Sequence, residues 1–422
     1  MVYRRPRGTR DWLPWEAYRK RWVEGRLRRV FERYGYGEVI TPAFESLELL
    51  VAKAGEEVKE QIYWFKDKAG RDLGLRFEVT TPVARIVSGR LDLPKPVRFY
   101  YILPVWRYEE PQKGRYREFW QAGVELIGVE GAEGDSEVIA LTARALEEVG
   151  LRDIEIRVSD RRIVEDLLIR AGVEKGKIEE AFRVLDKLEK KGRDFVVEGL
   201  SRLGVGRREA EKLLAVLGEG GLDVEVRSEE GRRGLKHLRD TLEILEESYG
   251  VKCSVDFSIV RGLGYYTGLV FEVKAPGAPG SIAGGGRYDN LITLVGGQPT
   301  PATGMAIGVE RLISVLEDRG ILPEYRPVDV VVVPVSKEGE VFLSSIRVAE
   351  TLRRAGLRVV VDYGRGLRKA LEKASSLKAC YAVIVGSREV KEGFVTVKRL
   401  DRWEESRVPL NVLEDEARLW SC

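Results

Sequence analysis

Polar residues that could do chemistry stand in the stretch WRYEEPQKGRYREFWQAGVEL, from Trp106 to Leu126. Gln121 and Glu125 are an even number of positions apart and alternate with apolar residues, so on a strand both lie on one face. A glutamine and a carboxylate on a buried strand need partners, because an unpaired buried polar group costs free energy. Either the two groups satisfy each other, or a small polar ligand lies on that face.

The chain lacks both common glycine-rich phosphate loops, since neither GxxxxGK[ST] nor GxGxxG occurs. A bound nucleotide would therefore need arginines to hold its phosphates. The guanidinium group suits this purpose because its fork of donors matches phosphate oxygens and it does not lose its charge. The candidates are Arg107, Arg115, Arg261 and Arg311.

Two further segments leave alternatives open. Arg261 opens RGLGYYTGLVFEV, ahead of Tyr265 and Tyr266, and it either binds a ligand or pairs with a carboxylate beside core tyrosines. IAGGGRYDNL is either a flexible turn or a place where a ligand approaches the backbone closely. LRFEVTTPVAR puts Glu78 and Thr80 on one face of a predicted strand.

Composition excludes several kinds of site. The chain has one histidine, His237, on a helical stretch, and we expect it to be an ordinary surface residue. The chain therefore has almost no residues from which a histidine-based triad or a multi-histidine metal site could form. The three cysteines, Cys253, Cys380 and Cys422, are far apart, which argues against a disulfide framework and a CxxC zinc site. No protein-bound structural metal is expected.

The overall class is that of a folded globular protein, with 44% apolar residues in 422. A net charge of +3 is too small to indicate nucleic-acid binding by itself. The sequence has no run of about 18 apolar residues and no apolar leader, which predicts a cytoplasmic protein without a membrane partner.

The patterns predict an α+β fold in two domains. Residues 1–325 contain hairpins and separate helices, which predicts an antiparallel sheet, and an almost purely helical block at 160–250 is inserted in it. After the linker EYRPVD, residues 326–422 alternate short buried strands with helices, as in a small α/β domain with a mainly parallel sheet.

Local patterns predict where individual elements begin and end. Pro14 suits the first turn of a helix, and Ser136 is predicted to cap a helix that ends at Gly150. A strand is predicted to end near Glu78, and VKCSVDFSIV alternates as a strand from Val251 to Ile259.

The order of these motifs resembles that of class II aminoacyl-tRNA synthetases, and within that class the histidyl-tRNA synthetase family. YGEVITPAFE resembles motif 1, VWRYEEPQKGRYREFWQAGVE motif 2 and TGMAIGVERL motif 3. RGLGYYTGLVFE and AGGGRYD resemble the histidine-specific signatures. The resemblance covers nearly the whole chain, and the two signatures are highly specific together.

The resemblance implies activation of L-histidine by ATP, which arrives with Mg²⁺, to histidyl-adenylate and pyrophosphate, then transfer to tRNA(His). It implies that Arg107 and Arg261 are catalytic, flanking the α-phosphate and the carboxylate. The implied ATP-binding residues are Arg107, Glu109 (adenine amino edge), Arg115 (γ-phosphate), Phe119 (adenine stacking) and Arg311 (phosphates).

For histidine, the resemblance implies Glu78, Thr80 and Gln121 at the α-amino group and Glu125 at the imidazole. Tyr265 and Tyr266 would shape the pocket that these residues and Arg261 form. Gln112 and Arg115 would face the tRNA acceptor end. The resemblance also implies a C-terminal anticodon-binding domain, an insert at the acceptor stem, and a homodimer through motif 1 and Pro42.

Three positions depart from the family pattern. Gly264 stands where aspartate is expected, Phe77 where proline is expected, and Trp120 where bacterial members often have histidine, so motif 2 is closer to the archaeal branch. Two other functions remain to be weighed. One is a non-catalytic, histidine-binding regulatory paralogue of ATP phosphoribosyltransferase, and the other is a general nucleic-acid-binding protein.

Overall fold

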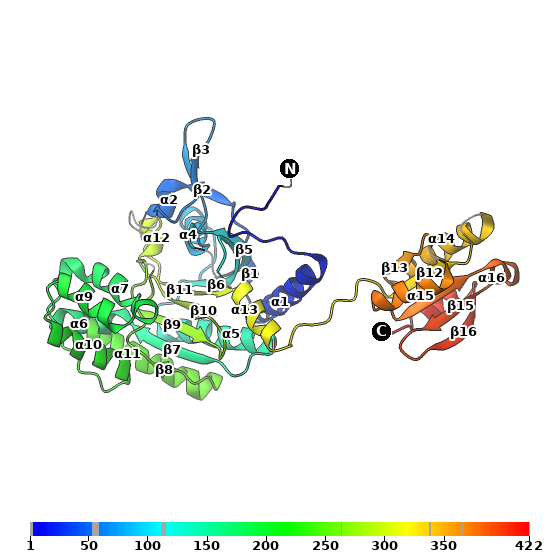
Figure 1. Cartoon of the computed structure of the whole chain (residues 1–422). Coiled ribbons are helices and arrows are strands. Elements are labelled where there is room, and N and C mark those ends of the chain that lie inside the picture. The colour runs from blue at the N-terminus through cyan, green and yellow to red at the C-terminus, as the bar shows by residue number, and fades with distance from the viewer. Residues whose placement is uncertain are drawn as a thin grey trace. The chain divides into compact units, whose positions relative to one another are not determined.

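The structure is a computed structural model that describes residues 3–52, 59–110, 115–262, 264–336, 339–364 and 366–421. The chain divides into two compact units, Met1–Pro323 and Glu324–Cys422 (Figure 1). The first unit is built on an antiparallel-dominated sheet, and the second has a sheet of its own. The predicted fold class, α+β with a separate α/β domain, is confirmed.

An eight-stranded sheet forms the centre of the first unit, and only its two outermost pairings are parallel. Its strands follow in the order β1 (Gly37–Glu38), β5 (Val97–Trp106), β6 (Glu118–Ile127), β11 (Ala302–Gly308), β10 (Ala283–Arg287), β9 (Leu269–Lys274), β7 (Glu155–Asp160) and β8 (Ser254–Val255). A smaller sheet has the order β2 (Phe44–Ser46), β4 (Asp72–Leu75) and β3 (Trp64–Lys66).

The two faces of the large sheet bury different apolar clusters, because successive side chains point to opposite faces. On one face Val124 and Leu126 of β6 pack with helices α1 (Pro14–Arg33) and α5 (Ala132–Glu148). On the other face a smaller cluster includes Tyr101, Tyr265 and Tyr288. The described residues of this unit also form α2 (Leu47–Val51), α4 (Thr80–Gly89), α12 (Leu291–Leu294) and α13 (Val309–Asp318).

Helices fill the chain between β7 and β8. They are α6 (Arg161–Arg170), the 3₁₀ turn η1 (Lys175–Lys177), α7 (Ile178–Leu185), α8 (Leu188–Lys191), α9 (Arg193–Arg202), α10 (Arg207–Glu219), α11 (Glu229–Ile244) and the π-helical turn η2 (Leu245–Tyr249). Their apolar residues join the same core cluster as α1 and α5, so the helices pack onto the sheet.

The predictions of a cap at Ser136 and of a strand from Val251 to Ile259 are wrong. Pro14 does begin α1, but α5 begins at Ala132, and the Ser136 hydroxyl donates to the Ala132 carbonyl at 2.8 Å instead of capping the helix. The predicted strand from Val251 to Ile259 is reduced to β8, because the Asp256 carboxylate accepts a hydrogen bond from the Ser258 N–H at 3.0 Å and turns the chain.

The prediction of a strand at Glu78 and Thr80 is also wrong. β4 ends at Leu75, and Thr80 is the first residue of α4. The Glu78 carboxylate accepts hydrogen bonds from the Thr81 N–H at 2.9 and 3.2 Å, which satisfies a backbone donor in the first turn of the helix. The sheet does not position these two residues; a helix start does.

The second unit has a five-stranded sheet in the order β13 (Val359–Val361), β12 (Val330–Pro334), β14 (Tyr381–Val385), β15 (Phe394–Arg399) and β16 (Glu404–Pro409). Its helices are α14 (Gly339–Arg354), α15 (Leu367–Ser376), α16 (Ser387–Glu392) and α17 (Leu413–Ala417). The expected mainly parallel sheet is wrong in its second half, since β14, β15 and β16 pair antiparallel. β15 and β16 follow each other too closely for a parallel crossover.

Two other expectations concern cysteines and membranes. Cys253 is a free thiol, whereas Cys380 is disulfide-bonded. Within the described part of the chain, no helix has both the length and the apolar composition needed to span a bilayer.

Candidate active site

A cavity of about 730 Å³ lies on the sheet face that carries Tyr101, Tyr265 and Tyr288. Most of the residues predicted for a site line it, namely Glu78, Thr80, Arg107, Glu109, Arg115, Phe119, Gln121, Arg261, Tyr265, Tyr266 and Arg311. Glu125 is the exception, because it lies beneath the lining. Gln112 falls outside the described residues.

Four arginines reach this cavity from separate segments, as expected if they replace a phosphate loop. Arg107 donates through Nε to the Phe77 carbonyl at 2.9 Å, and Arg311 donates to the Ser281 carbonyl at 2.8 Å. Burial, followed by the charges of Arg115 and Arg107, lowers the pKa of Arg311, so the group is a concentrated patch of positive charge. Such a patch favours a polyanion.

Two of the four arginines have carboxylate partners. Arg115 forms an ion pair with Glu109, and Arg261 donates through Nη1 to Glu272 at 2.8 Å. Arg107 and Arg311, by contrast, have no ion-pair partner among the residues that the structure describes. Both arginines line the cavity.

Both alternatives for Arg261, an ion pair with a carboxylate and a place in a ligand site, agree with the structure. Arg261 pairs with Glu272 beside buried tyrosines, and it also lines the cavity. Its φ of 57° is unusual for a residue other than glycine, a kind of backbone strain that clusters at functional sites. A Cβ on Gly284 would come within 2.7 Å of Nη1, so this glycine makes room for the guanidinium.

The glycine run of IAGGGRYDNL is therefore not a flexible turn. Gly284 belongs to β10, in the middle of the large sheet, and its strand neighbours on both sides are paired. The second reading, close approach of a group to the backbone, is the one that the structure supports at Arg261.

Glu125 is 1% exposed and is held by three residues of the cavity wall. Its Oε1 accepts from the Thr80 hydroxyl at 2.7 Å and from the Tyr101 hydroxyl at 3.2 Å, and its Oε2 accepts from the Tyr288 hydroxyl. A carboxylate has about four lone-pair positions, so one position on Oε2 is left over. Gly304, directly across from it in β11, lines the cavity.

Gln121 lies on the same face of β6 as Glu125, as predicted, but the two do not satisfy each other. Its Oε1 atom is buried without a hydrogen-bond partner among the described residues, although Gln121 lines the cavity. A buried amide oxygen without a partner is uncommon and points to a ligand or a water as its missing partner.

Sequence reasoning missed several residues of this site. Tyr288 directly follows the glycine run of AGGGRYD and could have been found from that motif. Glu272 could have been found as a carboxylate partner for Arg261. Tyr101 of β5 and Asp186, which follows α7 of the helical segment, carry no pattern that separates them from core or surface residues.

Burial raises the pKa of Glu125 to about 8, although its three hydroxyl partners oppose the shift. The ordinary value is 4.5, so between pH 4.5 and about 8 the folded protein keeps a proton that the unfolded chain has lost. The free energy of unfolding should therefore fall as pH rises through this window. Below pH 4.5 both states are protonated and the dependence on Glu125 ends.

Denaturant unfolding of the wild type and of Glu125→Gln between pH 4.5 and 8.5 measures this effect. Titrating groups that do not interact with Glu125, such as Glu310, cancel in the difference between the two proteins. The wild type should lose stability relative to the variant as pH rises. Parallel profiles would mean that Glu125 is ionised in the folded protein throughout this range.

Comparison with known proteins identifies the family of the chain. The family model described as histidyl-tRNA synthetase matches residues 8–312, and the anticodon binding domain model matches residues 329–418. A histidine–tRNA ligase from Thermococcus kodakarensis is 44% identical over 418 residues, covering 95% of each chain. The chain belongs to the histidyl-tRNA synthetase family. The resemblance read from the motifs is confirmed.

Solved structures of histidyl-tRNA synthetases share the fold. A crystal structure of the synthetase from Nostoc sp. PCC 7120 superposes with a TM-score of 0.80 at 27% identity, covering 100% of both chains. A structure from Bacillus halodurans, described as an ATP phosphoribosyltransferase regulatory subunit/histidyl-tRNA synthetase, has a TM-score of 0.76 at 26% identity and covers 92% of this chain and 99% of that one.

Proposed function

We propose that this histidyl-tRNA synthetase homologue activates L-histidine with ATP and transfers the histidyl group to tRNA(His). The observation that carries the proposal is one cavity with two unlike sets of groups. Four arginines line it, and Thr80, Tyr101 and Tyr288 of its wall hold a buried carboxyl group, Glu125, through their hydroxyls. A polyanionic nucleotide suits the arginines, and a small polar amino acid suits the carboxyl group.

In the first half-reaction a carboxylate oxygen of histidine attacks the α-phosphate of ATP, and the bond to the departing pyrophosphate breaks. Negative charge grows on the phosphoryl oxygens, so fixed cations that face them lower the barrier. Arg107 and Arg261 are the catalytic residues of this step. Phe119 lies under Arg107, 5.2 Å from ring centroid to guanidinium carbon, and offers its face to adenine.

Three other residues that line the cavity are assigned to ATP. Arg115 and Arg311 take the outer phosphates, and Glu109 exchanges its ion pair with Arg115 for the adenine amino group. ATP brings Mg²⁺ with it as a co-substrate, and the arginines supply fixed charge around the α-phosphate.

In the same cavity, Glu78, Thr80 and Gln121 hold the α-amino group of histidine. The unpartnered Oε1 of Gln121 is the acceptor that an ammonium group would satisfy. The remaining position on Oε2 of Glu125 hydrogen-bonds an imidazole nitrogen, while Tyr265 and Tyr266 enclose the ring. A carboxylate in a dry pocket rejects apolar analogues, which would leave it unpaired.

In the second half-reaction a ribose hydroxyl of the terminal tRNA nucleotide attacks the histidyl carbonyl carbon, and AMP leaves. We assign Arg115 to this acceptor end, together with Gln112, which lies outside the described residues. We assign residues 1–325 to catalysis, with the helical insert 160–250 at the acceptor stem, and residues 326–422 to the anticodon.

We further propose a cytoplasmic homodimer. Ile40 and Phe44, which flank Pro42 in motif 1, are 73% and 50% exposed. Large apolar side chains so placed are suited to a protein interface. The second copy would cover them.

Gly304→Ala tests the tight fit around Glu125. The new Cβ would stand 1.9 Å from Oε2 of Glu125 and 2.7 Å from the Val124 carbonyl, so the carboxylate must move. We expect the KM for histidine to rise about tenfold or more, with the KM for ATP little changed. Gly218→Ala on α10 is the matched control, because its Cβ would meet nothing within 4 Å. An equal KM for histidine in Gly304→Ala and Gly218→Ala would contradict a role for the close packing of Gly304 against Glu125.

A regulatory paralogue that binds histidine without catalysis is the competing function. It does not account for the four arginines in the cavity or for the match of residues 329–418 to an anticodon binding domain. Charging of tRNA(His) with labelled histidine in the presence of ATP separates the two. Histidine that binds but never becomes acid-precipitable with tRNA would favour the regulator.

A further inference from the structure

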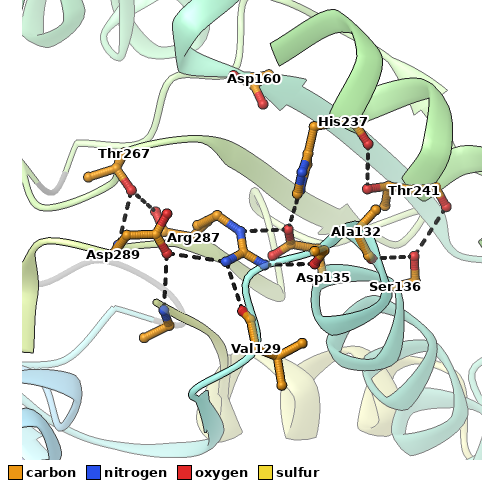
Figure 2. Close-up of polar contacts among 12 residues, drawn as sticks. Val129, Ala132, Asp135, Ser136, Asp160, His237, Thr241, Thr267, Arg287 and Asp289 are labelled. Carbon is orange, nitrogen blue, oxygen red and sulfur yellow. Dashed lines mark hydrogen bonds and ion pairs between the residues drawn. The ribbon is translucent and has the colours of Figure 1, made fainter. Parts of the chain in front are cut away.

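A second buried polar cluster lies on the face of the large sheet opposite the cavity (Figure 2). It consists of His237 on α11, Asp135 on α5 and Arg287 at the end of β10, and we call it the rear cluster. The Asp135 carboxylate is fully buried, and its Oδ2 lies 2.6 Å from His237 Nε2 and 2.9 Å from Arg287 Nε. The expectation that His237 is an ordinary surface residue is therefore wrong, since only 14% of its side chain is exposed.

Arg287 ties together the two strands that carry the proposed imidazole-binding groups. Besides Asp135, its guanidinium donates to the carbonyls of Val129 and Gly131, both at 3.0 Å, and these residues directly follow β6. Glu125 stands on β6. The next residue after Arg287 is Tyr288, whose hydroxyl donates to Glu125.

Arg287 and Tyr288 point to opposite faces, as neighbours in an extended chain do. The Tyr288 ring packs against Tyr265 in the cavity wall, with ring centroids 5.8 Å apart, while Arg287 contacts α5 behind the sheet. A shift of the Arg287 backbone would thus move the Tyr288 hydroxyl on the other face. The rear cluster sets where that hydroxyl meets Glu125.

His237 fixes the position of Asp135 in the rear cluster through a hydrogen bond. Burial by itself raises the pKa of Asp135. The charge of Arg287 and the interaction with His237 outweigh burial and keep this pKa below its ordinary value. Asp135 is therefore ionised, and Nε2 of His237 is the donor. The same turn of α11 contacts α5 a second time, where the Ser136 hydroxyl donates to the Thr241 carbonyl at 3.3 Å (Figure 2).

We propose that His237 is a positioning residue for the histidine pocket, acting through Asp135 and Arg287 to keep Tyr288 on Glu125. His237 belongs to the helical insert, so this chain of contacts also couples the insert to recognition of the amino acid. The inference rests on the proposed function, since it takes Glu125 as the group that binds imidazole.

The test compares His237→Ala and His237→Gln with Lys236→Ala, an exposed neighbour on α11 whose partner is Asp240. ATP–pyrophosphate exchange gives KM for histidine, KM for ATP and kcat, and calorimetry gives the Kd for histidine. We expect His237→Ala to raise the KM and Kd for histidine about tenfold, with kcat and the KM for ATP within about twofold. Glutamine, whose amide N–H can reach Asp135, should restore part of the affinity, and Lys236→Ala should match the wild type.

Wild-type histidine affinity in both folded His237 variants would overturn the proposal. A purely structural role would instead lower kcat and weaken both substrates together, and it would track the loss of thermal stability. If the alanine variant does not fold, the glutamine variant carries the test alone. A wild type that binds histidine without exchange would refute the proposed function, while the calorimetric comparison would still decide the role of His237.

Discussion

Replacing Arg261 by alanine is expected to lower the rate of adenylate formation about 100-fold or more, while histidine binds nearly as before. Arg261 lines the cavity and is held by Glu272 at 2.8 Å, so its guanidinium is fixed before ATP arrives. A cation fixed in this way stabilises the charge that appears on the phosphoryl oxygens in the transition state. It contributes less to the free energy of histidine binding. Pre-steady-state adenylate formation and calorimetric binding of histidine separate these quantities.

The loss of Arg261 also leaves the Glu272 carboxylate without its ion pair, which by itself destabilises the site. The double variant Arg261→Ala/Glu272→Gln removes that unpaired charge. Stability should recover in the double variant, but the rate should not. Arg261→Lys, which keeps the charge and loses the fork, should fall between wild type and alanine. An unchanged rate in Arg261→Ala would remove Arg261 from the catalytic residues.

Glu125→Ala is expected to weaken histidine binding by about 100-fold and to erase selectivity for the imidazole ring. The variant removes the buried carboxyl group and leaves the hydroxyls of Thr80, Tyr101 and Tyr288 without their shared partner. Binding of ATP, which we assign to the arginines, should change little. Calorimetry with histidine and with ring-substituted analogues measures the loss.

Glu118→Ala is the matched control for this variant. Glu118 is on the same strand, β6, and does not line the cavity. It should bind histidine as the wild type does. Retention of wild-type selectivity in Glu125→Ala would refute the imidazole-binding role and would shift attention to Tyr288 and Tyr265 as the groups that recognise the ring.

Most residues of the cavity could be predicted from the sequence, because they are polar or glycine residues in segments that otherwise look buried. Arginines ahead of adjacent tyrosines, a glycine run, and polar residues at even spacing on a strand are costly choices, and Arg107, Arg261 and Gln121 all line the cavity. Glu125 shows the limit of such reasoning. The alternation of β6 gives its face, but only the structure shows that hydroxyls from three other segments cover it.

The rest of the site depends on contacts between segments far apart in the chain. His237 reads as a polar residue on an amphipathic helix, and its partner Asp135 is 102 positions away on another helix. The start of α4 at Thr80 was likewise missed, because a Glu78 side chain that accepts from the helix backbone looks like strand alternation in the sequence. Tertiary structure supplies these partners, and no local pattern encodes them.

The measurement that tests the central claim most directly is ATP–pyrophosphate exchange with each of the twenty amino acids in turn, without tRNA. The account predicts exchange that depends on histidine and on no other amino acid, because the imidazole ring pairs with Glu125 while the carboxylate of histidine meets the α-phosphate between Arg107 and Arg261. Exchange with a different amino acid, or none with histidine although histidine binds, would contradict it.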